Sequence, residues 1–345
     1  MRLLPVEDPP PEHRLRLDEQ HRLLAIVKEV FAELVREEPP PHGSTVLTAG
    51  LARAHFGQRA SMEGLPLPGS APAAVVVPAP GRGDGYWAGA SSVVHDGAGG
   101  YAAGYRVRNG HDGHDQTVLA RSADGERFET VAVLERERFG ARWMQRPALV
   151  RTGDGWRLFV CCGAPESKRW WIETLQSPDL EGFATAASRR TFPDEAAYGV
   201  KDPVVRLVDG TWHAWICCHP LDVPGAEDRM FTGWATSPDG WDWTWRGTVL
   251  RGRPGAWDAR GARLTTFLPD GRAGYDGRAT AEENWFERTA VATPTGDGRF
   301  AALPDSPVVD ARYLDVLALP DGGVRIYYEA RLPDLSHELR TELIR

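Results

Sequence analysis

The stretch RPALVRTGDGWRLFVCCGAP, residues 146–165, contains two apolar runs on either side of a Gly-Asp-Gly turn. Short runs rich in β-branched and aromatic residues, separated by turn residues, predict a β-hairpin. The same unit recurs at residues 90–109, 202–220, 261–280 and 314–332. The glycine at the start of each second run advances along the chain by 55, 55, 61 and 52 residues. This spacing indicates one supersecondary unit that is repeated five times.

A second turn follows four of the five hairpins and combines turn-forming residues with an aromatic side chain. These turns read RSADGERF (121–128), QSPDLEGF (176–183), TSPDGWDW (236–243) and PTGDGRF (294–300). Such a turn is expected between the third and fourth strands of a four-stranded unit.

Five four-stranded units predict an all-β protein, namely a five-bladed β-propeller, over residues 64–345. The blades are expected to start near residues 87, 143, 201, 258 and 312. A strand at residues 73–77 (AAVVV) is the candidate that completes the fifth blade, because closing the ring removes exposed sheet edges. A β-sandwich with unrelated hairpins is the alternative.

Residues 1–63 are expected to form a separate helical extension at the N-terminus. Within residues 17–36 the apolar side chains follow a helical period and predict one amphipathic α-helix; they are Leu23, Leu24, Val27, Val30, Phe31 and Leu34. The prolines at positions 39–41 end this helix. We expect it to pack on the propeller, and a helix that binds a partner is the alternative.

The composition excludes several classes of function. A formal net charge of −8 argues against a nucleic-acid partner and against an anionic membrane surface. No run of 18 apolar residues occurs, and no secretory signal is visible, so we expect a cytoplasmic protein. The three lysines among 40 basic residues suggest a bacterial genome of high GC content. Because zinc, nucleotide and dinucleotide motifs are missing, we expect no metal and no cofactor.

The segments RPALVRTGDGWRLFVC (146–161) and KDPVVRLVDGTWHAWIC (201–217) resemble the blade signature of five-bladed glycoside hydrolases. That superfamily includes arabinanases and xylosidases, invertase-like enzymes and mannoside phosphorylases. The resemblance covers about residues 85–345 and implies a carbohydrate-active enzyme that processes a glycoside or sugar-containing small molecule in a central funnel. In these families the innermost strand of each blade opens with Asp-Pro or Arg-Pro. In the first blade this chain has Ala90 and Ser91 instead, so the matching general base is missing.

Residues at the starts of the first strands should converge on the axis and bind the substrate. The predicted binding residues at these starts are Trp87, Trp143, Gln145, Arg146, Lys201, Arg260, Arg312, Tyr313 and Asp315. Two more predicted binding residues, Asp276 and Arg278, stand at the end of a second strand. The ends of the second strands are expected to add further side chains; these are Tyr105, Arg106, His219, Tyr275 and Glu329.

Cleavage of a glycoside requires two carboxyl groups, about 5–5.5 Å or about 6.5–9.5 Å apart. The candidate catalytic residues are Asp202, Asp258, Glu282, Glu283 and Glu287. Each also has a structural interpretation. Asp202 would pair with a neighbouring cation, Asp258 would cap a turn, and the three glutamates would be solvated charges.

Four arginines occupy similar inner positions; they are Arg146, Arg260, Arg278 and Arg312. If their guanidinium groups are not paired with protein carboxylates, they predict an anionic ligand. Two alternative functions therefore stay open. One is a biosynthetic tailoring enzyme with non-hydrolytic chemistry on an anionic small molecule, and the other is a non-catalytic propeller that binds sugar or protein.

Overall fold

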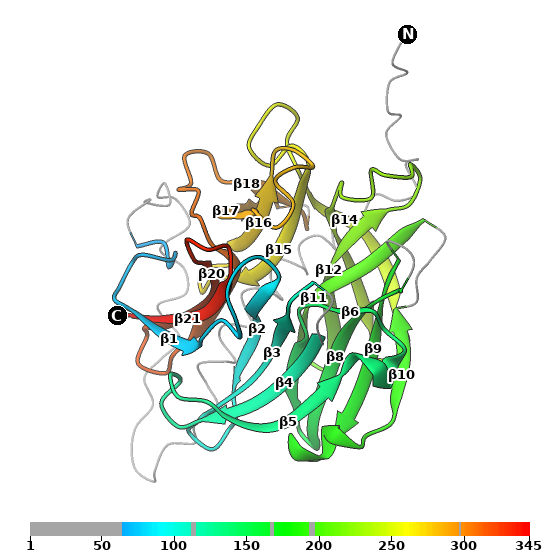
Figure 1. Ribbon diagram of the computed structural model, residues 1–345, viewed down its shortest axis with the longest axis vertical. Helices are drawn as coiled ribbons and strands as arrows, with labels where there is room; N and C mark the ends of the chain where they lie inside the picture. Colours follow the sequence, from blue (N-terminus) through cyan, green and yellow to red (C-terminus); the bar gives the residue numbers. More distant parts are fainter. Residues whose placement is uncertain (1–63, 112–114, 166–168, 193–196, 297) are drawn as a thin grey trace, which may run out of the picture.

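The computed structural model describes residues 64–111, 115–165, 169–192, 197–296 and 298–345 (Figure 1). The helix predicted within residues 17–36 lies outside these ranges. The regular secondary structure of the described chain is β-strand, apart from two short 3-10 helices, η2 (Arg136–Phe139) and η3 (Glu181–Ala184). Among these residues no helix is long and apolar enough to cross a membrane.

All five predicted hairpins are present, and each belongs to an antiparallel run of strands. The first run contains β2 (Tyr86–His95), β3 (Tyr101–Asn109), β4 (Asp115–Ser122) and β5 (Glu129–Glu135). The second contains β6 (Trp143–Met144), β7 (Ala148–Thr152), β8 (Gly155–Gly163), β9 (Trp170–Ser177) and β10 (Ser188–Phe192).

The third run contains β11 (Tyr198–Val208), β12 (Thr211–Pro220), β13 (Phe231–Ser237) and β14 (Thr244–Arg251). The fourth contains β15 (Gly261–Phe267), β16 (Ala273–Arg278), β17 (Arg288–Pro294) and β18 (Phe300–Ala302). The fifth contains β19 (Arg312–Ala318), β20 (Val324–Arg331), β21 (His337–Ile344) and β1 (Ala73–Val77). The first and fifth runs share one sheet through the parallel pair Trp87 and His337.

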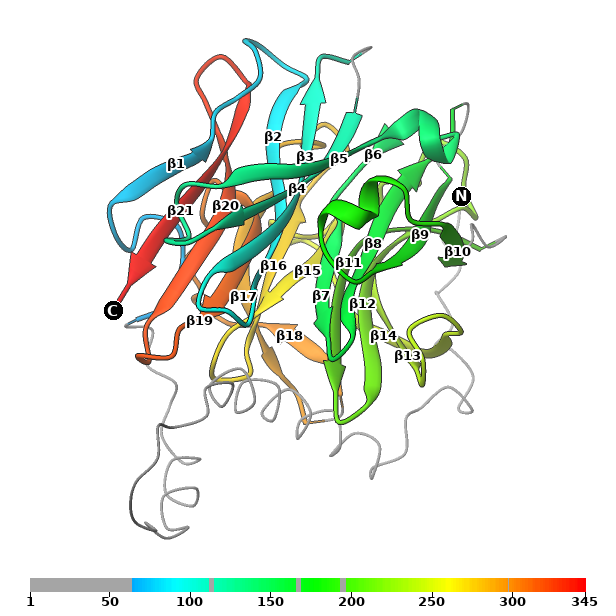
Figure 2. The same cartoon turned by 90° about the horizontal axis from the view of Figure 1, so that it is seen from below.

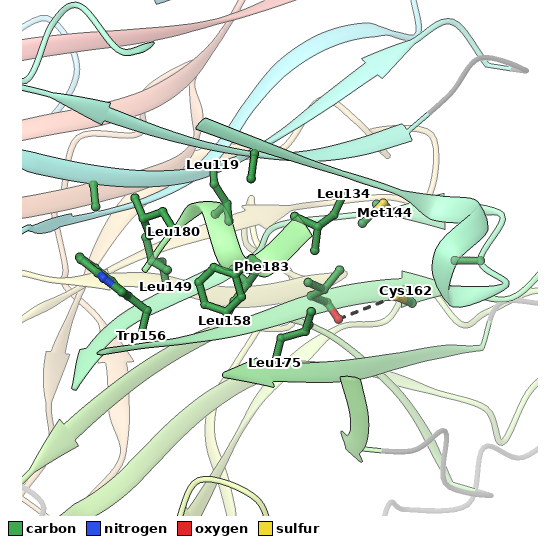
Figure 3. Packing of buried hydrophobic residues seen from close by; sticks show 14 of the residues in the cluster. Leu119, Leu134, Met144, Leu149, Trp156, Leu158, Cys162, Leu175, Leu180 and Phe183 are labelled. Atoms are coloured by element: carbon green, nitrogen blue, oxygen red, sulfur yellow. Dashed lines mark hydrogen bonds between the residues drawn. The ribbon is translucent and has the colours of Figure 1, made fainter. Parts of the chain in front are cut away.

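Hydrophobic side chains pack between neighbouring runs of strands. The layer between the first two runs contains Leu119 and Leu134 on one side and Leu149, Leu158 and Leu175 on the other (Figure 3). Four similar clusters lie between the second and third, third and fourth, fourth and fifth, and fifth and first runs. The packing therefore returns to its starting point, as it must in a ring of sheets.

The first strands of the five runs are also joined by hydrogen bonds and an ion pair. The links are Leu149 to Ser92, Arg146 to Asp202, Arg263 to Asp202, Val316 to Thr266 and Val93 to Asp315. Together they connect β2, β7 with the segment that precedes it, β11, β15 and β19 in a closed circuit. Residues that are far apart in the sequence consequently meet around one centre.

Three first strands contain a bulge at the same place. The pairing shifts between Gly89 and Ser92, between Lys201 and Val204 and between Arg312 and Asp315. In each bulge one residue has a positive φ angle, of 52° at Ala90, 50° at Asp202 and 55° at Tyr313. A bulge of this kind redirects a side chain, often beside a functional site. Of the three equivalent positions, one carries a carboxylate, that of Asp202.

The strand predicted at residues 73–77 is present as β1 and pairs with β21 (Figures 1 and 2). The buried Glu342 carboxylate fixes the segment before β1, because it accepts hydrogen bonds from Gly69 N, Ala71 N and Tyr328 Oη, each at 2.8 Å. This contact fastens the N-terminal side of the described chain to its last strand.

We expect Glu342→Ala to lower the free energy of unfolding by about 3 kcal/mol, because it removes three hydrogen bonds to a charged group. Urea unfolding followed by tryptophan fluorescence measures this loss. Glu338→Ala, which removes a partly exposed ion pair with Arg340 on the same strand, is the control and should cost less than about 1 kcal/mol. Equal losses in the two variants would contradict the role given to Glu342.

Candidate functional site

Arg146 lies at the centre of the closed circuit and is almost completely buried. Its Nε donates a hydrogen bond to the carbonyl of Ser91 at 2.9 Å, and its Nη1 donates to the carbonyl of Thr265. Its Nη2 lies 3.5 Å from the Asp315 carboxylate, and its backbone N–H donates to Asp202 at 3.2 Å. These partners come from β2, β15, β19 and β11. Arg146 therefore contacts the first strands of all four other runs and lies at the axis.

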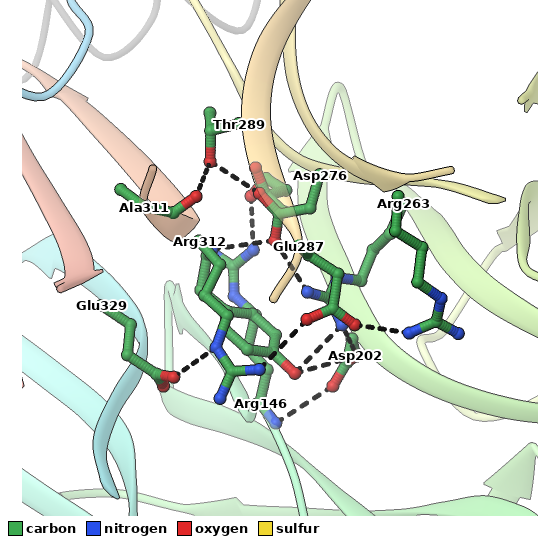
Figure 4. Close-up of polar contacts among 12 residues, drawn as sticks. Arg146, Asp202, Arg263, Asp276, Glu287, Thr289, Ala311, Arg312 and Glu329 are labelled. Atoms are coloured by element: carbon green, nitrogen blue, oxygen red, sulfur yellow. Dashed lines mark hydrogen bonds and ion pairs between the residues drawn. The ribbon is translucent and has the colours of Figure 1, made fainter. Parts of the chain in front are cut away.

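A second arginine bridges two carboxylates next to this centre (Figure 4). Arg263 donates from Nη1 to Asp202 at 2.9 Å and from Nη2 to Asp276 at 2.7 Å. Asp276 also accepts hydrogen bonds from Thr289 Oγ1 at 2.7 Å and from the backbone N–H of Tyr313 at 2.9 Å. Arg263 also packs over the Tyr313 ring at 3.9 Å. The predicted residues Asp202, Asp276 and Tyr313 thus belong to one buried network.

The network continues through Glu287, which joins two of the predicted arginines. Its carboxylate accepts hydrogen bonds from Arg278 at 2.7 Å and from Arg312 at 3.1 Å. Arg312 in turn contacts Glu329 at 2.5 Å, and Glu329 contacts Arg106 at 2.6 Å. Gln145 is attached to the same chain of contacts, because it accepts a hydrogen bond from Arg106 at 2.6 Å.

Three carboxylates in this network have pKa values below their ordinary range. Burial alone would raise the pKa of Asp202, but the charges of Lys201, Arg263 and Arg106 outweigh it and lower the pKa. Burial is likewise outweighed at Glu287, where the neighbouring arginines lower the pKa. At Glu329 they lower the pKa to about 2. At neutral pH these groups are carboxylates, so they can accept protons, attack an electrophile or stabilise positive charge.

Asp276 and Asp315 differ from these three residues. Both are fully buried, and burial raises the pKa of each despite a neighbouring arginine. Both also accept hydrogen bonds from backbone N–H groups, at 2.9 Å and 2.7 Å. Their contacts therefore position β16 and β19 around the axis.

His219 presents an unused hydrogen-bond acceptor beside the network. Its Nδ1 lies 2.6 Å from the carbonyl of Glu227, which can only accept, so Nδ1 carries the proton. Burial, together with the charges of Lys201 and Arg278, lowers the pKa of His219 well below the usual value, so the ring is neutral. The buried Nε2 has no hydrogen-bond partner among the described residues. Its lone pair can accept a hydrogen bond from a hydroxyl group.

Aromatic side chains gather next to Arg312. The Trp87 ring is buried, and the Arg312 guanidinium lies 4.9 Å from its centre. Trp285 packs against Trp87 at 5.7 Å and against His111 at 5.4 Å, and the residue as a whole is 39% exposed. Trp285 has a φ of 74°, a strained conformation for a non-glycine residue, and its carbonyl accepts a hydrogen bond from Arg312. Trp143 on β6 and Trp170 on β9 both pair with Gly163 of β8, one from each neighbouring strand.

Trp285, His111 and Arg263 were not among the residues predicted from the sequence. Trp285 stands in the segment ENWFER, where the available signal was a pair of adjacent aromatic residues in a polar loop. Arg263 stands in the buried strand β15, where a charged residue between apolar neighbours was the available signal. Arg106 and Glu329 were expected at the ends of second strands, and the network contains both.

The other candidate acids lie outside this network. The buried Asp258 accepts hydrogen bonds from Arg253 and from Tyr275 Oη, at 3.0 Å each. Glu282 is exposed. Glu283 is partly exposed and accepts hydrogen bonds from the Ala279 N–H and from Arg288.

The four inner arginines all have carboxylate partners. Arg146 pairs with Asp315, Arg260 with Asp228, Arg278 with Glu287 and Arg312 with Glu329. Because their guanidinium groups are paired with protein carboxylates, these arginines do not predict an anionic ligand. Lys201 lies 3.7 Å from Asp202 and 5.2 Å from the Trp170 ring, so its ammonium also has nearby partners. Within the described ranges, no group of three or more His, Cys, Asp or Glu side chains is arranged to hold a metal ion.

The buried histidines predict a pH dependence of stability. Burial lowers the pKa of His337 to about 3 and of His213 to about 4. An unfolded histidine titrates near pH 6.5, so below that pH the unfolded chain binds more protons and the folded state loses stability. We expect a loss of about 2 kcal/mol per histidine between about pH 7 and pH 5.

Urea unfolding at the two pH values measures this loss. The variant His337→Phe keeps a ring beside Trp87. It removes one of three histidines whose pKa burial lowers, the others being His213 and His219, so the pH-dependent loss should shrink by about a third. A free energy of unfolding that stays constant between the two pH values would contradict the prediction.

Solved structures with the same fold are carbohydrate-active propeller proteins. The β-1,2-mannobiose phosphorylase from Listeria innocua, in complex with β-1,2-mannobiose, is similar at a TM-score of 0.53 and 13% identity, over 74% of this chain and 89% of that one. Sucrose-6-phosphate hydrolase from Lactobacillus gasseri is similar at a TM-score of 0.55 and 9% identity, over 76% of this chain and 59% of that one.

A third structure is described as a member of the GH130 family of mannoside phosphorylases, which contains glycoside hydrolases that target β-1,2 mannosidic linkages in Candida mannan. It is similar at a TM-score of 0.51 and 14% identity, over 80% of this chain and 95% of that one. No family model matches the chain, and no curated protein matches it. The resemblance predicted from residues 146–161 and 201–217 is confirmed for the fold, which is that of the propeller glycosidases and phosphorylases.

Proposed function

We propose that the protein is a carbohydrate-active enzyme that processes a glycoside or sugar-containing small molecule. The observation that carries the proposal is that Asp202, Glu287 and His219 all lie within reach of the charges of Lys201 and Arg263. Arg312 joins Glu287 to the exposed residue Trp285. Carboxylates, a neutral acceptor and a flat aromatic ring are the groups that bind sugar hydroxyls and the apolar face of a pyranose.

The five antiparallel runs are proposed to be the blades of a five-bladed propeller that spans residues 64–345. The substrate would enter where the first strands begin, because Trp87, Lys201 and Arg312 lie at those ends. We further propose that the protein acts in the cytoplasm of a bacterium.

In the proposed reaction Glu287 and Asp202 act as ionised groups. A carboxylate next to the anomeric carbon stabilises an oxocarbenium-like transition state, or it serves as base or nucleophile. His219 Nε2 would accept a hydrogen bond from a sugar hydroxyl, and Trp285 would stack on the ring.

A second candidate is a propeller that binds sugar without cleaving it. It is supported by Ala90, which occupies the bulge position equivalent to Asp202, and by the low pKa of Glu287, which leaves that group without a proton to donate. Non-hydrolytic chemistry on an anionic molecule receives less support, because the inner arginines are paired with carboxylates.

Turnover on a defined panel of sugars separates the two candidates. The purified full chain is incubated with β-1,2-mannobiose, sucrose, sucrose 6-phosphate and p-nitrophenyl glycosides, each with and without inorganic phosphate. An enzyme is expected to release a free sugar or, with phosphate, a sugar phosphate. Binding detected by calorimetry with no product in either condition would favour the non-catalytic candidate and would contradict the first.

A further inference from the structure

A hollow beside the outermost strand of the second run is lined by three tryptophans that alternate in sequence. Its volume is about 260 Å³, and its lining includes Trp241, Trp243, Trp245, Phe192, Arg189 and Asp242. It lies where β10, the outermost strand of the second run, meets the turn between β13 and β14. The hollow shares no lining residue with the Arg146–Arg263–Arg312 network.

The indoles of the hollow are held in place by their neighbours. Trp243 packs on Phe192 at 4.8 Å, and Trp245 packs on Phe192 at 6.0 Å. The Arg157 guanidinium lies 4.2 Å from the Trp241 ring. All three tryptophans nevertheless stay partly exposed. Rigid aromatic faces that reach solvent bind a ligand with little loss of conformational entropy.

The turn that carries Trp241 does not require a tryptophan. In the third run Asp239 accepts hydrogen bonds from the N–H groups of Trp241 and Asp242, at 2.8 Å and 3.0 Å. In the first run Asp124 accepts the same two bonds from Glu126 and Arg127, both at 2.9 Å. The same turn thus forms with charged residues at both positions.

An arginine side chain lies beside this turn in both runs. Arg157 stacks on Trp241, whereas Arg325 forms an ion pair with Glu126 at 3.2 Å. A glutamate at position 241 would accordingly satisfy both the turn and the adjacent arginine. The fold therefore does not require the partly exposed indole of Trp241.

The polar groups of the hollow specify the class of ligand. Arg189 and Asp242 form an exposed ion pair, so this pair carries no net charge. Their guanidinium and carboxylate can donate hydrogen bonds to, and accept them from, hydroxyl groups. A ligand that matches these features has an apolar face for the indoles and several hydroxyl groups at its edge.

We propose that this hollow is a second carbohydrate site, in which a neutral pyranose stacks on Trp241 and bonds to Asp242 and Arg189. The site would hold a sugar unit outside the central funnel, and it does not depend on chemistry at Glu287.

The indole N–H resonances of the ¹⁵N-labelled full chain test the proposal. The Trp241 resonance is assigned by its absence in Trp241→Phe. Methyl β-D-mannopyranoside, β-1,2-mannobiose, sucrose, maltose and cellobiose are titrated separately. We expect at least one of them to shift the Trp241 resonance in a saturable manner, both in the wild type and in Trp285→Ala.

Two further variants identify the contacts. Asp242→Ala should weaken the apparent affinity about tenfold, the effect of a lost hydrogen bond to a charged group. Trp241→Glu should keep the melting temperature of the wild type, and the sugar should no longer shift the Trp243 and Trp245 resonances. If none of the five sugars shifts the Trp241 resonance, or if Trp241→Glu binds as the wild type does, the proposal is wrong.

Discussion

Replacing Glu287 with glutamine is expected to lower kcat/KM by about 10²–10⁴, the usual contribution of a positioned acid–base group. The substitution keeps the size of the side chain and removes its charge. Glu287 is the carboxylate that joins Arg278 to Arg312, and both arginines lower its pKa. An uncharged amide can no longer act as base or nucleophile, or stabilise a developing positive charge.

The measurement is steady-state kinetics on whichever panel sugar the wild type turns over. Glu282→Gln is the matched control, because it makes the same chemical change on an exposed side chain five residues earlier, and we expect less than about a twofold effect. Melting temperatures distinguish loss of chemistry from loss of fold. Activity that survives in Glu287→Gln and disappears in Glu282→Gln would show that the reaction takes place outside the buried network.

Replacing Arg146 with methionine is expected to lower the free energy of unfolding by about 3–5 kcal/mol. The loss is large because Asp315 would keep a buried charge without its cation, and two buried carbonyl groups would lose their donors. Methionine retains part of the hydrophobic volume, so the loss reports mainly on the polar contacts.

Denaturant unfolding measures this change, and Arg121→Met is its control. Arg121 forms an ion pair with Glu181 in which both side chains are 43–50% exposed, so its removal should cost about 1 kcal/mol or less. A change of similar size in the two variants would mean that the first strands do not depend on Arg146 for their arrangement.

The strands could be predicted because the hairpin RPALVRTGDGWRLFVCC occurs in five variants with nearly constant spacing. Apolar alternation and turn residues are local signals, and β7–β8 and β11–β12 form where they predict. The strand at residues 73–77 could also be predicted, because a ring of sheets needs a strand from an earlier part of the chain to complete the last unit.

The candidate site was predicted in part. Asp202, Arg312 and Tyr313 follow from their position at the start of a first strand, and the structure brings them together. Arg263 and Trp285 could not be found in this way. The contact of Arg263 with Asp202 depends on a bulge with φ of 50°, and the exposure of Trp285 depends on a turn with φ of 74°. In both places the positive φ angle occurs at a residue other than glycine, so the sequence gives no signal for it.

Asp258 shows the limit of reasoning from position alone. It precedes β15, as Lys201 and Asp202 lie at the corresponding end of β11, yet its carboxylate contacts Arg253 and Tyr275 instead of the network. Which carboxylates face one another depends on the direction of each side chain, and the spacing of the repeat does not encode that direction.

We propose that sugar binds where the first strands meet, and a crystal structure of the full chain soaked with β-1,2-mannobiose or sucrose tests this proposal. We expect electron density for a sugar within hydrogen-bonding distance of Glu287 or of His219 Nε2, with Trp285 against the ring. Sugar density found solely at other surfaces, with Glu287 and His219 Nε2 contacting protein atoms alone, would contradict it.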